Sequence, residues 1–433
     1  MERRLDTLGW ILYKRAEYPR ALGLIEDSAA KLAELPDVQY HLGMTHYMLG
    51  EEDVARVALR KAAESTKDFF GKDEARQSLA ILAVDVKTAN TANISKLEKH
   101  LAGKPNDPVA AARLAAIHER DGRTDKAAET YQAALKYNPK NPQLILKLAQ
   151  LYADRLNQIQ KALDLAKSAH ALSPDDARIS SLLGRLVYQT GGDLKWSAGL
   201  LEDSARKLPD DPQIPYDLAW CYYSLGRLTE AETAMQTAQA AGFPRMEDAR
   251  RFLLMVPAAG NARQAQQVFP EAEKALRTDP NYVPALMISS AVQEGQGHYQ
   301  QAAQLYHQIL GHFPFFAPAT RNLAILYFNY LPDEQKAYNF AIQARQAFPQ
   351  DSEIPRILGI LAYRRGEYAR ASQLLKESAQ NRKGDAELLY YLGMAQYKLK
   401  AKPESKAALQ QSLALNLPAK LADEARRVLA ELK

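Results

Sequence analysis

Apolar side chains recur at spacings of three and four residues along nearly the whole chain, in segments separated by short polar or glycine-containing turns. Leu42, Gly43 and Tyr47 share one face of a helix in this pattern, and Gly50 follows where that helix has to end. A second apolar helix face, centred on Leu59, comes directly after it. The pattern therefore predicts two helices joined by a tight turn, followed by further pairs of the same kind.

The pair of helices repeats with a period of about 34 residues. One position of each first helix carries a small or short side chain, which lets the second helix of the pair approach closely. These positions are Gly9, Gly43, Ala80, Ala115, Ala149, Gly184, Ala219, Val256, Ser290, Ala324, Gly359 and Gly393. A fixed period indicates a repeat array, so a chain of 433 residues need not form the about three globular domains that its length suggests.

The units resemble the tetratricopeptide repeat family, whose pattern is W-x2-L-G-x2-Y followed by alanine, an aromatic residue, alanine and proline. The fourth unit carries this pattern at Leu114, Ala115, Gly122, Ala127, Tyr131, Ala134 and Pro139. The resemblance covers nearly all of the chain. It implies an all-α solenoid, a right-handed superhelix of about twelve antiparallel helix pairs over residues 1–418, with a capping helix over residues 419–433.

Two units depart from the pattern, in the ranges 68–105 and 244–280. In the first, the polar stretch 87–93 stands where a short turn belongs. In the second, we expect the turn between the helices to run from Pro257 to Asn261. Each departure is either a tolerated loop insertion or a hinge that changes the curvature of the array, and the sequence leaves both interpretations open.

Composition narrows the classes of function. The net charge of +5, from 56 basic and 51 acidic residues, is too small to attract nucleic acid through the overall electrostatic field of the protein. No apolar run approaches the roughly 18 residues of a transmembrane helix. The chain starts inside an amphipathic helix without a secretory signal, which we interpret as the start of a piece cut from a longer protein. Its compartment stays unknown, because the cytoplasm and the periplasm both fit.

The sequence offers no pattern for catalysis. It has no phosphate-binding loop, no H-E-x-x-H zinc motif and no serine nucleophile elbow. Cys221 is the only cysteine, so an intramolecular disulfide or a thiolate metal site is excluded, and its apolar neighbours favour a buried structural thiol over a nucleophile. We expect no catalytic residue, no metal site and no cofactor.

The family resemblance places the first helix of each unit on the concave side of the superhelix. Large aromatic residues give contact area and arginine gives planar donors, which suits recognition of a partner. The candidate groove residues are Trp10, Tyr13, Tyr40, Tyr47, Tyr216, Trp220, Tyr223, Arg321, Arg356, Tyr363, Arg364, Tyr390 and Tyr397. The alternative is that aromatic residues at helical spacing only pack one helix on another, and it stays open for each of them.

The resemblance implies a non-catalytic scaffold that binds a protein or peptide in its concave groove, as part of a larger bacterial protein or complex. The segment 5–15 is similar to long bacterial arrays of this family, some of which serve exopolysaccharide production and export. The alternative function is therefore an accessory subunit of an exopolysaccharide machine that contacts polysaccharide directly. In that case Trp10, Tyr216 and Trp220 would stack on sugar rings.

Overall fold

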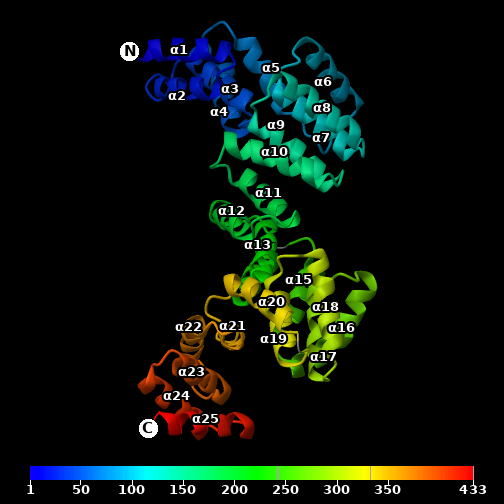
Figure 1. Ribbon diagram of the computed structural model, residues 1–433. Helices are drawn as coiled ribbons and strands as arrows, with labels where there is room; N and C mark the ends of the chain where they lie inside the picture. The colour runs from blue at the N-terminus through cyan, green and yellow to red at the C-terminus, as the bar shows by residue number, and fades with distance from the viewer. Residues whose placement is uncertain (241–242, 332, 433) are drawn as a thin grey trace. The chain divides into compact units, whose positions relative to one another are not determined.

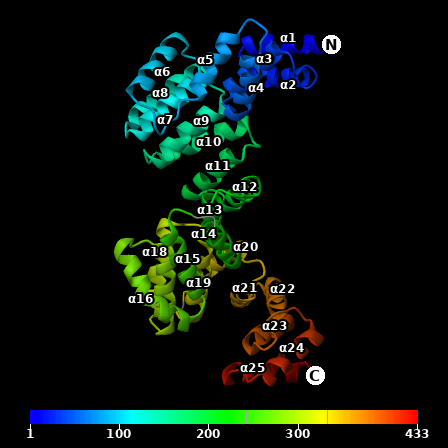
Figure 2. The same ribbon diagram turned by 180° about the vertical axis from the view of Figure 1, so that it is seen from behind.

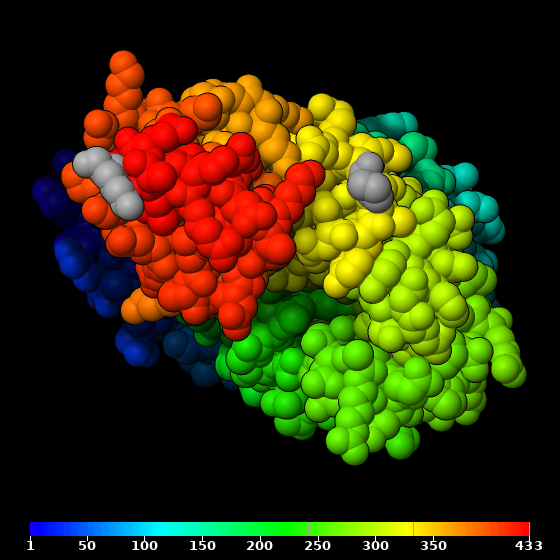
Figure 3. All heavy atoms as spheres, turned by 60° about the horizontal axis from the view of Figure 1, so that its bottom comes forward, coloured from blue at the N-terminus to red at the C-terminus, as the bar shows by residue number. Residues whose placement is uncertain are grey.

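The computed structural model describes residues 1–240, 243–331 and 333–432. These residues form 25 α-helices, and no β-strand occurs among them. The chain divides into two compact units, Met1–Gly192 and Asp193–Lys433. Figures 1 and 2 show short helices following one another in antiparallel pairs within each unit. Figure 3 draws all heavy atoms, and on the face shown the atoms of the C-terminal residues form a closely packed surface.

The first unit contains eleven helices: α1 (Glu2–Lys14), α2 (Tyr18–Ala29), α3 (Pro36–Leu49), α4 (Glu52–Glu64), α5 (Lys72–Leu82), α6 (Thr91–Gly103), α7 (Pro108–Arg120), α8 (Thr124–Tyr137), α9 (Pro142–Asp154), α10 (Ile159–Leu172) and α11 (Ala177–Gln189). The described part of the second unit contains α12 (Leu194–Lys207), α13 (Gln213–Ser224), α14 (Leu228–Ala240), α15 (Met246–Ala258), α16 (Ala262–Thr278), α17 (Val283–Gly295), α18 (Tyr299–His312), α19 (Ala317–Asn329), α20 (Glu334–Ala347), α21 (Glu353–Arg364), α22 (Tyr368–Ala379), α23 (Ala386–Lys398), α24 (Lys402–Ala414) and α25 (Ala419–Glu431).

Local sequence fixes where the helices begin and end. Gly50 ends α3 in the left-handed conformation, with φ of 80°, which glycine adopts without steric cost. Asn141 caps α9 by accepting a hydrogen bond from the backbone N–H of Leu144, and Pro142 occupies the first helical position. Such signals at both ends explain why so many short helices follow one another without long loops.

Most first helices pack against the second helix of their own pair, and that second helix packs against the first helix of the next pair, so contacts run mainly between neighbours. Contacts that skip one helix join only first helices, as in α1 with α3 and α21 with α23. Among the described residues, first helices of successive pairs contact one another, whereas second helices make no such extensive contact, so the first helices line the inner side of the curve within each unit. The prediction of an all-α array of stacked helix pairs is confirmed.

The small residue in the first helix is a requirement of close packing. A β-carbon on Gly43 would lie 2.7 Å from Cγ of Leu59 and 2.9 Å from the Leu59 backbone nitrogen. Gly393 meets Leu409 in the same way, at 2.7 Å from Cγ. Because a backbone atom blocks the space, a larger residue has to push the two helices of the pair apart.

We expect Gly43→Ala to lower the free energy of unfolding by about 1–3 kcal/mol through overpacking, although alanine favours helices more than glycine does. Gly23→Ala is the matched control, because Gly23 lies inside α2 and a β-carbon added there would meet nothing within 4 Å. That change should raise stability by about 0.5–1 kcal/mol. Urea unfolding measures the free energy of unfolding of both variants. If both substitutions raise it, or both lower it, the packing argument is contradicted.

The two atypical ranges contain helices that are paired differently. In the first, α5 packs on α4 and α6 packs on α7, whereas α5 and α6 have no extensive contact with each other. Helix α3 contacts α7 directly across this opening. In the second range, α16 packs more extensively on α17 than on α15. The expectation of a turn from Pro257 onward is wrong, because α15 continues through Pro257 to Ala258.

Candidate functional site

Every residue predicted for the groove lies on a first helix, namely α1, α3, α13, α19, α21 or α23. Their exposure differs widely. The buried residues are Tyr40, Tyr47, Tyr216, Tyr223, Tyr390 and Arg356. The partly exposed ones are Trp10, Tyr13, Trp220, Arg321, Tyr363 and Tyr397, and Arg364 is exposed. Most of them gather in three groups, one in the first unit and two in the second, as the ring and ion-pair contacts below show.

The N-terminal aromatic cluster consists of Trp10, Tyr13, Tyr40 and His41, where α1 meets α3. The Trp10 ring stacks on Tyr13 at 4.2 Å and on the His41 imidazole at 4.0 Å, and lies 5.3 Å from Tyr40. The Tyr40 hydroxyl donates to Glu74 at 2.5 Å. Burial, reinforced by that carboxylate, raises the pKa of Tyr40. Trp10 and Tyr13 thus offer partly exposed ring surface on a rigid support.

Tyr47 stands apart from this cluster. Its side chain is buried, and its hydroxyl donates to both oxygens of Asp107, at 2.9 and 3.0 Å. Burial, together with the nearby carboxylate, raises the pKa of Tyr47 well above its usual range. The side chain therefore joins α3 to α7 and is not free to contact a partner.

The central aromatic cluster surrounds Trp220 on α13. Its indole ring lies 6.4 Å from Tyr216, 6.3 Å from Tyr223, 5.1 Å from Phe252 and 6.0 Å from Tyr282. These rings come from α13, α15 and the residue that precedes α17, and they meet Trp220 edge to face. Trp220 is therefore held firmly, while part of its surface stays exposed.

Arg356 in the C-terminal group is bound within the protein. Its guanidinium contacts Glu353 at 3.0 Å, Asp385 at 2.9 Å and Glu387 at 2.6 Å. It also lies 5.5 Å from the ring centre of Phe328, and only 10% of its side chain is exposed. A partner could reach this arginine only by displacing carboxylates that hold it already.

The other arginines of this group are paired as well. Arg321 binds Asp351, and Arg364 binds Glu334 at 2.5 Å. Arg364 and Glu334 are both more than a third exposed, so their pair contributes little and exchanges easily with solvent or a partner. Arg364 also lies over Phe328, which Arg356 contacts too. Arg356 and Arg364 are thus brought together, whereas Arg321 lies over a different ring, that of Phe348.

The predicted tyrosines of α21 and α23 each have a different partner within the protein. Tyr363 packs against Tyr391 at 5.3 Å, and burial raises the pKa of Tyr363 to about 12. Tyr390 donates to Glu424 at 2.7 Å, and Tyr397 donates to Glu431. Tyr397 is separated from the arginines in this way, because its hydroxyl turns toward α25.

Sequence reasoning missed the partners of these side chains. Phe252 and Tyr282 support Trp220, and Tyr391 lies between Tyr363 and Arg364. One signal was available. Three tyrosines donate to a glutamate 34 residues later, one repeat further along: Tyr40 to Glu74, Tyr390 to Glu424 and Tyr397 to Glu431. A tyrosine one period before a glutamate indicates a bond between successive repeats.

Comparison with known families agrees with the helix pairs. A family model described as tetratricopeptide repeat matches residues 119–186 and 192–253. These two segments are therefore similar to tetratricopeptide repeats.

Two curated relatives match part of the chain. The E3 SUMO-protein ligase RanBP2 of Pan troglodytes is 29% identical over 127 residues, and that of Homo sapiens is 30% identical over the same length. The match takes in 29% of this chain and spans only 4% of the length of either relative.

Solved tetratricopeptide repeat structures are similar at low identity. YrrB, described as a TPR protein with an unusual peptide-binding site, is 16% identical and covers 44% of this chain and 95% of its own, with a TM-score of 0.35. The APC/C hetero-tetramer Cut9–Hcn1 is 14% identical over 99% of this chain and 96% of its own, with a TM-score of 0.35. The P58(IPK) TPR domain is 12% identical over 100% and 97%, with a TM-score of 0.30.

The described residues also bear on whether the chain has a reactive thiol, a metal site or a membrane span. Burial raises the pKa of the Cys221 thiol to about 11, and its sulfur contacts the Leu194 carbonyl oxygen at 3.2 Å. Over residues 1–240, 243–331 and 333–432, no three His, Cys, Asp or Glu side chains are grouped so that they could hold a metal ion. None of the helices described combines the length and the low polarity needed to cross a membrane.

Proposed function

We propose that this protein is a non-catalytic tetratricopeptide repeat scaffold that binds a protein or peptide through the exposed parts of its inner aromatic clusters. Its place would be within a larger bacterial protein or complex, as the resemblance of segment 5–15 suggests. The observation that carries the proposal is Trp220, partly exposed on an inner helix and supported by rings from its own helix α13, from α15 and from the residue that precedes α17. Aromatic side chains that are rigid before binding lose little entropy on contact and typically dominate recognition.

Trp10 offers a second anchor of the same kind in the first unit. It is stacked on Tyr13 and His41, and the ammonium group of Lys14 lies 4.6 Å from its ring centre. By contrast, Arg356 is committed to its own carboxylates, which favours the tryptophans over an arginine strip as the main contact. The C-terminal arginines stay a prediction, with Arg364 the most accessible of them.

The third tryptophan provides a natural control. Trp196 lies on α12, a second helix, and is exposed at its surface. We expect peptides selected on the whole protein from a random display library to lose affinity about tenfold or more with Trp10→Ala or Trp220→Ala. Trp196→Ala should leave their affinity unchanged. Isothermal titration with the selected peptides measures this, and urea unfolding shows whether each variant stays folded.

Because Trp220 is packed among other rings, Trp220→Phe is measured beside Trp220→Ala. It keeps an aromatic ring in the cluster while it removes the indole surface. If all three tryptophan variants bind the peptides equally well, the inner clusters are packing only and the proposal fails.

The alternative is an accessory subunit of an exopolysaccharide machine that contacts glycan directly. The exposed faces of Trp10 and Trp220 would then stack on sugar rings. A glycan array probed with the wild type and the same three variants decides between the two functions. Glycan signals lost with Trp10→Ala or Trp220→Ala, with no peptide recovered from the library, would favour the alternative.

A further inference from the structure

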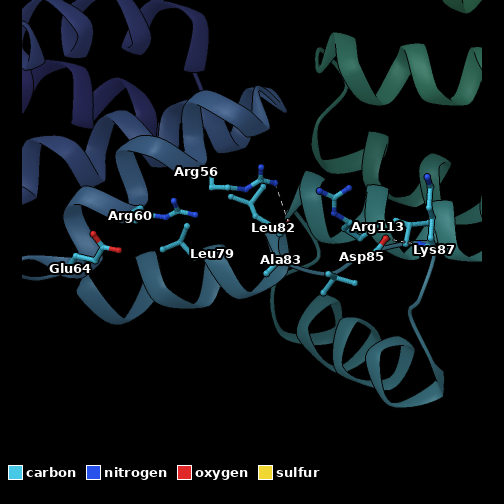
Figure 4. Close-up of a pocket in the computed structure, with 11 residues that line it drawn as sticks. Arg56, Arg60, Glu64, Leu79, Leu82, Ala83, Asp85, Lys87 and Arg113 are labelled. Atoms are coloured by element: carbon cyan, nitrogen blue, oxygen red, sulfur yellow. Dashed lines mark hydrogen bonds between the residues drawn. The ribbon is translucent and has the colours of Figure 1, made fainter.

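A second concave surface lies in the first atypical range, and no residue of the two aromatic clusters lines it. It is a cavity of about 720 Å³ between α4, α5, the linker 83–87 and Arg113 of α7. Figure 4 shows Arg56 and Arg60 extending from α4 on one side and Lys87 and Arg113 on the other. We propose that this cavity binds an acidic peptide segment that also carries an apolar side chain.

The opened helix pair creates the cavity. Helix α6 packs on α7 instead of on α5, so the end of α5 and the linker that follows it lack the cover that a paired helix would give. Leu79, Val84 and Val86 remain partly exposed as a result. They form an apolar floor of the cavity, together with Leu82.

Positive charge surrounds this floor. Arg56 and Arg60 are four residues apart and share one face of α4. Across the residues that the structure describes, the side chains of Arg60 and Lys87 have no ion-pair or hydrogen-bond partner. Arg56 is held only loosely, at 3.3 Å from the fully exposed Asp53 and 3.4 Å from the Leu82 carbonyl oxygen.

Two further observations indicate that the cavity favours an anion. Arg113 binds Glu52, yet its Nε is buried and has no hydrogen-bond partner within the described residues. Of the two carboxylates in the lining, Asp85 is occupied by its own turn, because it accepts from the Lys87 backbone N–H at 2.9 Å and from the Thr88 hydroxyl at 3.0 Å. Glu64 is the only other carboxylate among the lining residues described.

An acidic peptide fits this chemistry better than a simple phosphate. Guanidinium groups bind carboxylates with two parallel hydrogen bonds, and the Leu and Val floor offers burial to a neighbouring apolar side chain. Free phosphate would gain nothing from that floor and would face Glu64. The proposal does not depend on the tryptophan clusters, since none of their residues lines the cavity.

The test uses the whole protein and a short fluorescein-labelled peptide of glutamate, leucine and glycine. Its two counterparts have glutamine at each glutamate, or glycine at each leucine. Fluorescence anisotropy should show clear binding of the first peptide and weaker binding of both counterparts. Binding should also fall as salt rises, because exposed charges are screened beyond about 10 Å at 0.1 M ionic strength.

The decisive variant is Arg60→Gln with Lys87→Gln, and its matched control is Lys61→Gln with Lys99→Gln. Lys61 and Lys99 are exposed, lie on α4 and α6, and are absent from the cavity lining, so both variants lose the same charge. The decisive variant should bind the glutamate peptide about tenfold more weakly, with the control unchanged.

Equal losses in both variants would mean that only bulk charge matters, and would overturn the proposal. Equal binding of the leucine-free peptide, with inorganic phosphate competing as well as the peptide, would show a general anion site instead. If the wild-type protein does not bind the glutamate and leucine peptide, the proposed acidic-peptide site is also refuted. Trp10→Ala and Trp220→Ala should leave this binding intact, so its outcome is separate from that of the proposed scaffold function.

Discussion

Arg356→Ala is expected to lower the free energy of unfolding by about 3–5 kcal/mol, because it removes a largely buried cation from three carboxylates. Glu353 and Asp385 keep Arg382 as a partner, at 2.6 and 3.3 Å, whereas Glu387 loses its guanidinium. Glu353 and Asp385 have 13% and 15% of their side chains exposed, and Glu387 has 36%. The more exposed Glu387 places the expected loss near the lower end of that range. Unfolding in urea measures the loss, and hydrogen exchange should show that α21 and α23 open first.

Arg426→Ala is the control, since Arg426 pairs with Asp423 at 2.8 Å while both side chains are about two-thirds exposed or more. A surface pair of this kind contributes about 0–1 kcal/mol. If Arg356→Ala is no more destabilising than Arg426→Ala, the Arg356 cation is not needed by its carboxylates and remains available for a partner. Arg356 would then again be a candidate partner-binding residue of the groove.

The array of helix pairs could be predicted because its determinants are local. The small residues at positions such as Gly43 and Gly393 recur at a fixed period and meet a leucine of the paired helix. The identity of the first helices followed from the same period, so every predicted groove residue lies on one. Exposure could not be predicted, because it depends on the next repeat: Tyr40 is covered by a bond to Glu74, whereas Trp10 on the same face stays partly exposed.

The opening between α5 and α6 could not be predicted either. The polar stretch 87–93 indicated an irregular joint between the helices. The same local sequence is compatible with a tolerated loop and with a change in how the helices pack. Contacts between α3 or α4 and the helices after the joint decide which of the two forms. Glu52 binds Arg113 and Asn141 donates to the Met48 carbonyl oxygen at 2.8 Å, so the second repeat meets the fourth and the start of the fifth. Interactions between residues 61 and 93 positions apart leave no periodic trace.

Asp107 is the centre of this contact, and Asp107→Ala is expected to lower the free energy of unfolding by about 2–4 kcal/mol. Its carboxylate caps α7 by accepting from the Ala110 N–H at 2.9 Å, and it accepts from Tyr47 and lies 2.8 Å from His100 Nε2. Loss of a cap accounts for about 1 kcal/mol. The rest arises because the buried Tyr47 hydroxyl is left without an acceptor.

Asp193→Ala separates the two contributions. Asp193 caps α12 through the N–H groups of Lys195 and Trp196 and is exposed, so its loss removes a cap alone. We expect about 1 kcal/mol for that variant. A double-mutant cycle of Asp107→Ala with Tyr47→Phe should give a coupling free energy of about 1 kcal/mol or more, because the two groups share one buried hydrogen bond. Additive effects, or an Asp107→Ala loss no larger than that of Asp193→Ala, would mean that α3 and α7 touch without stabilising each other. The first unit would then unfold repeat by repeat, as an array with contacts only between neighbours does.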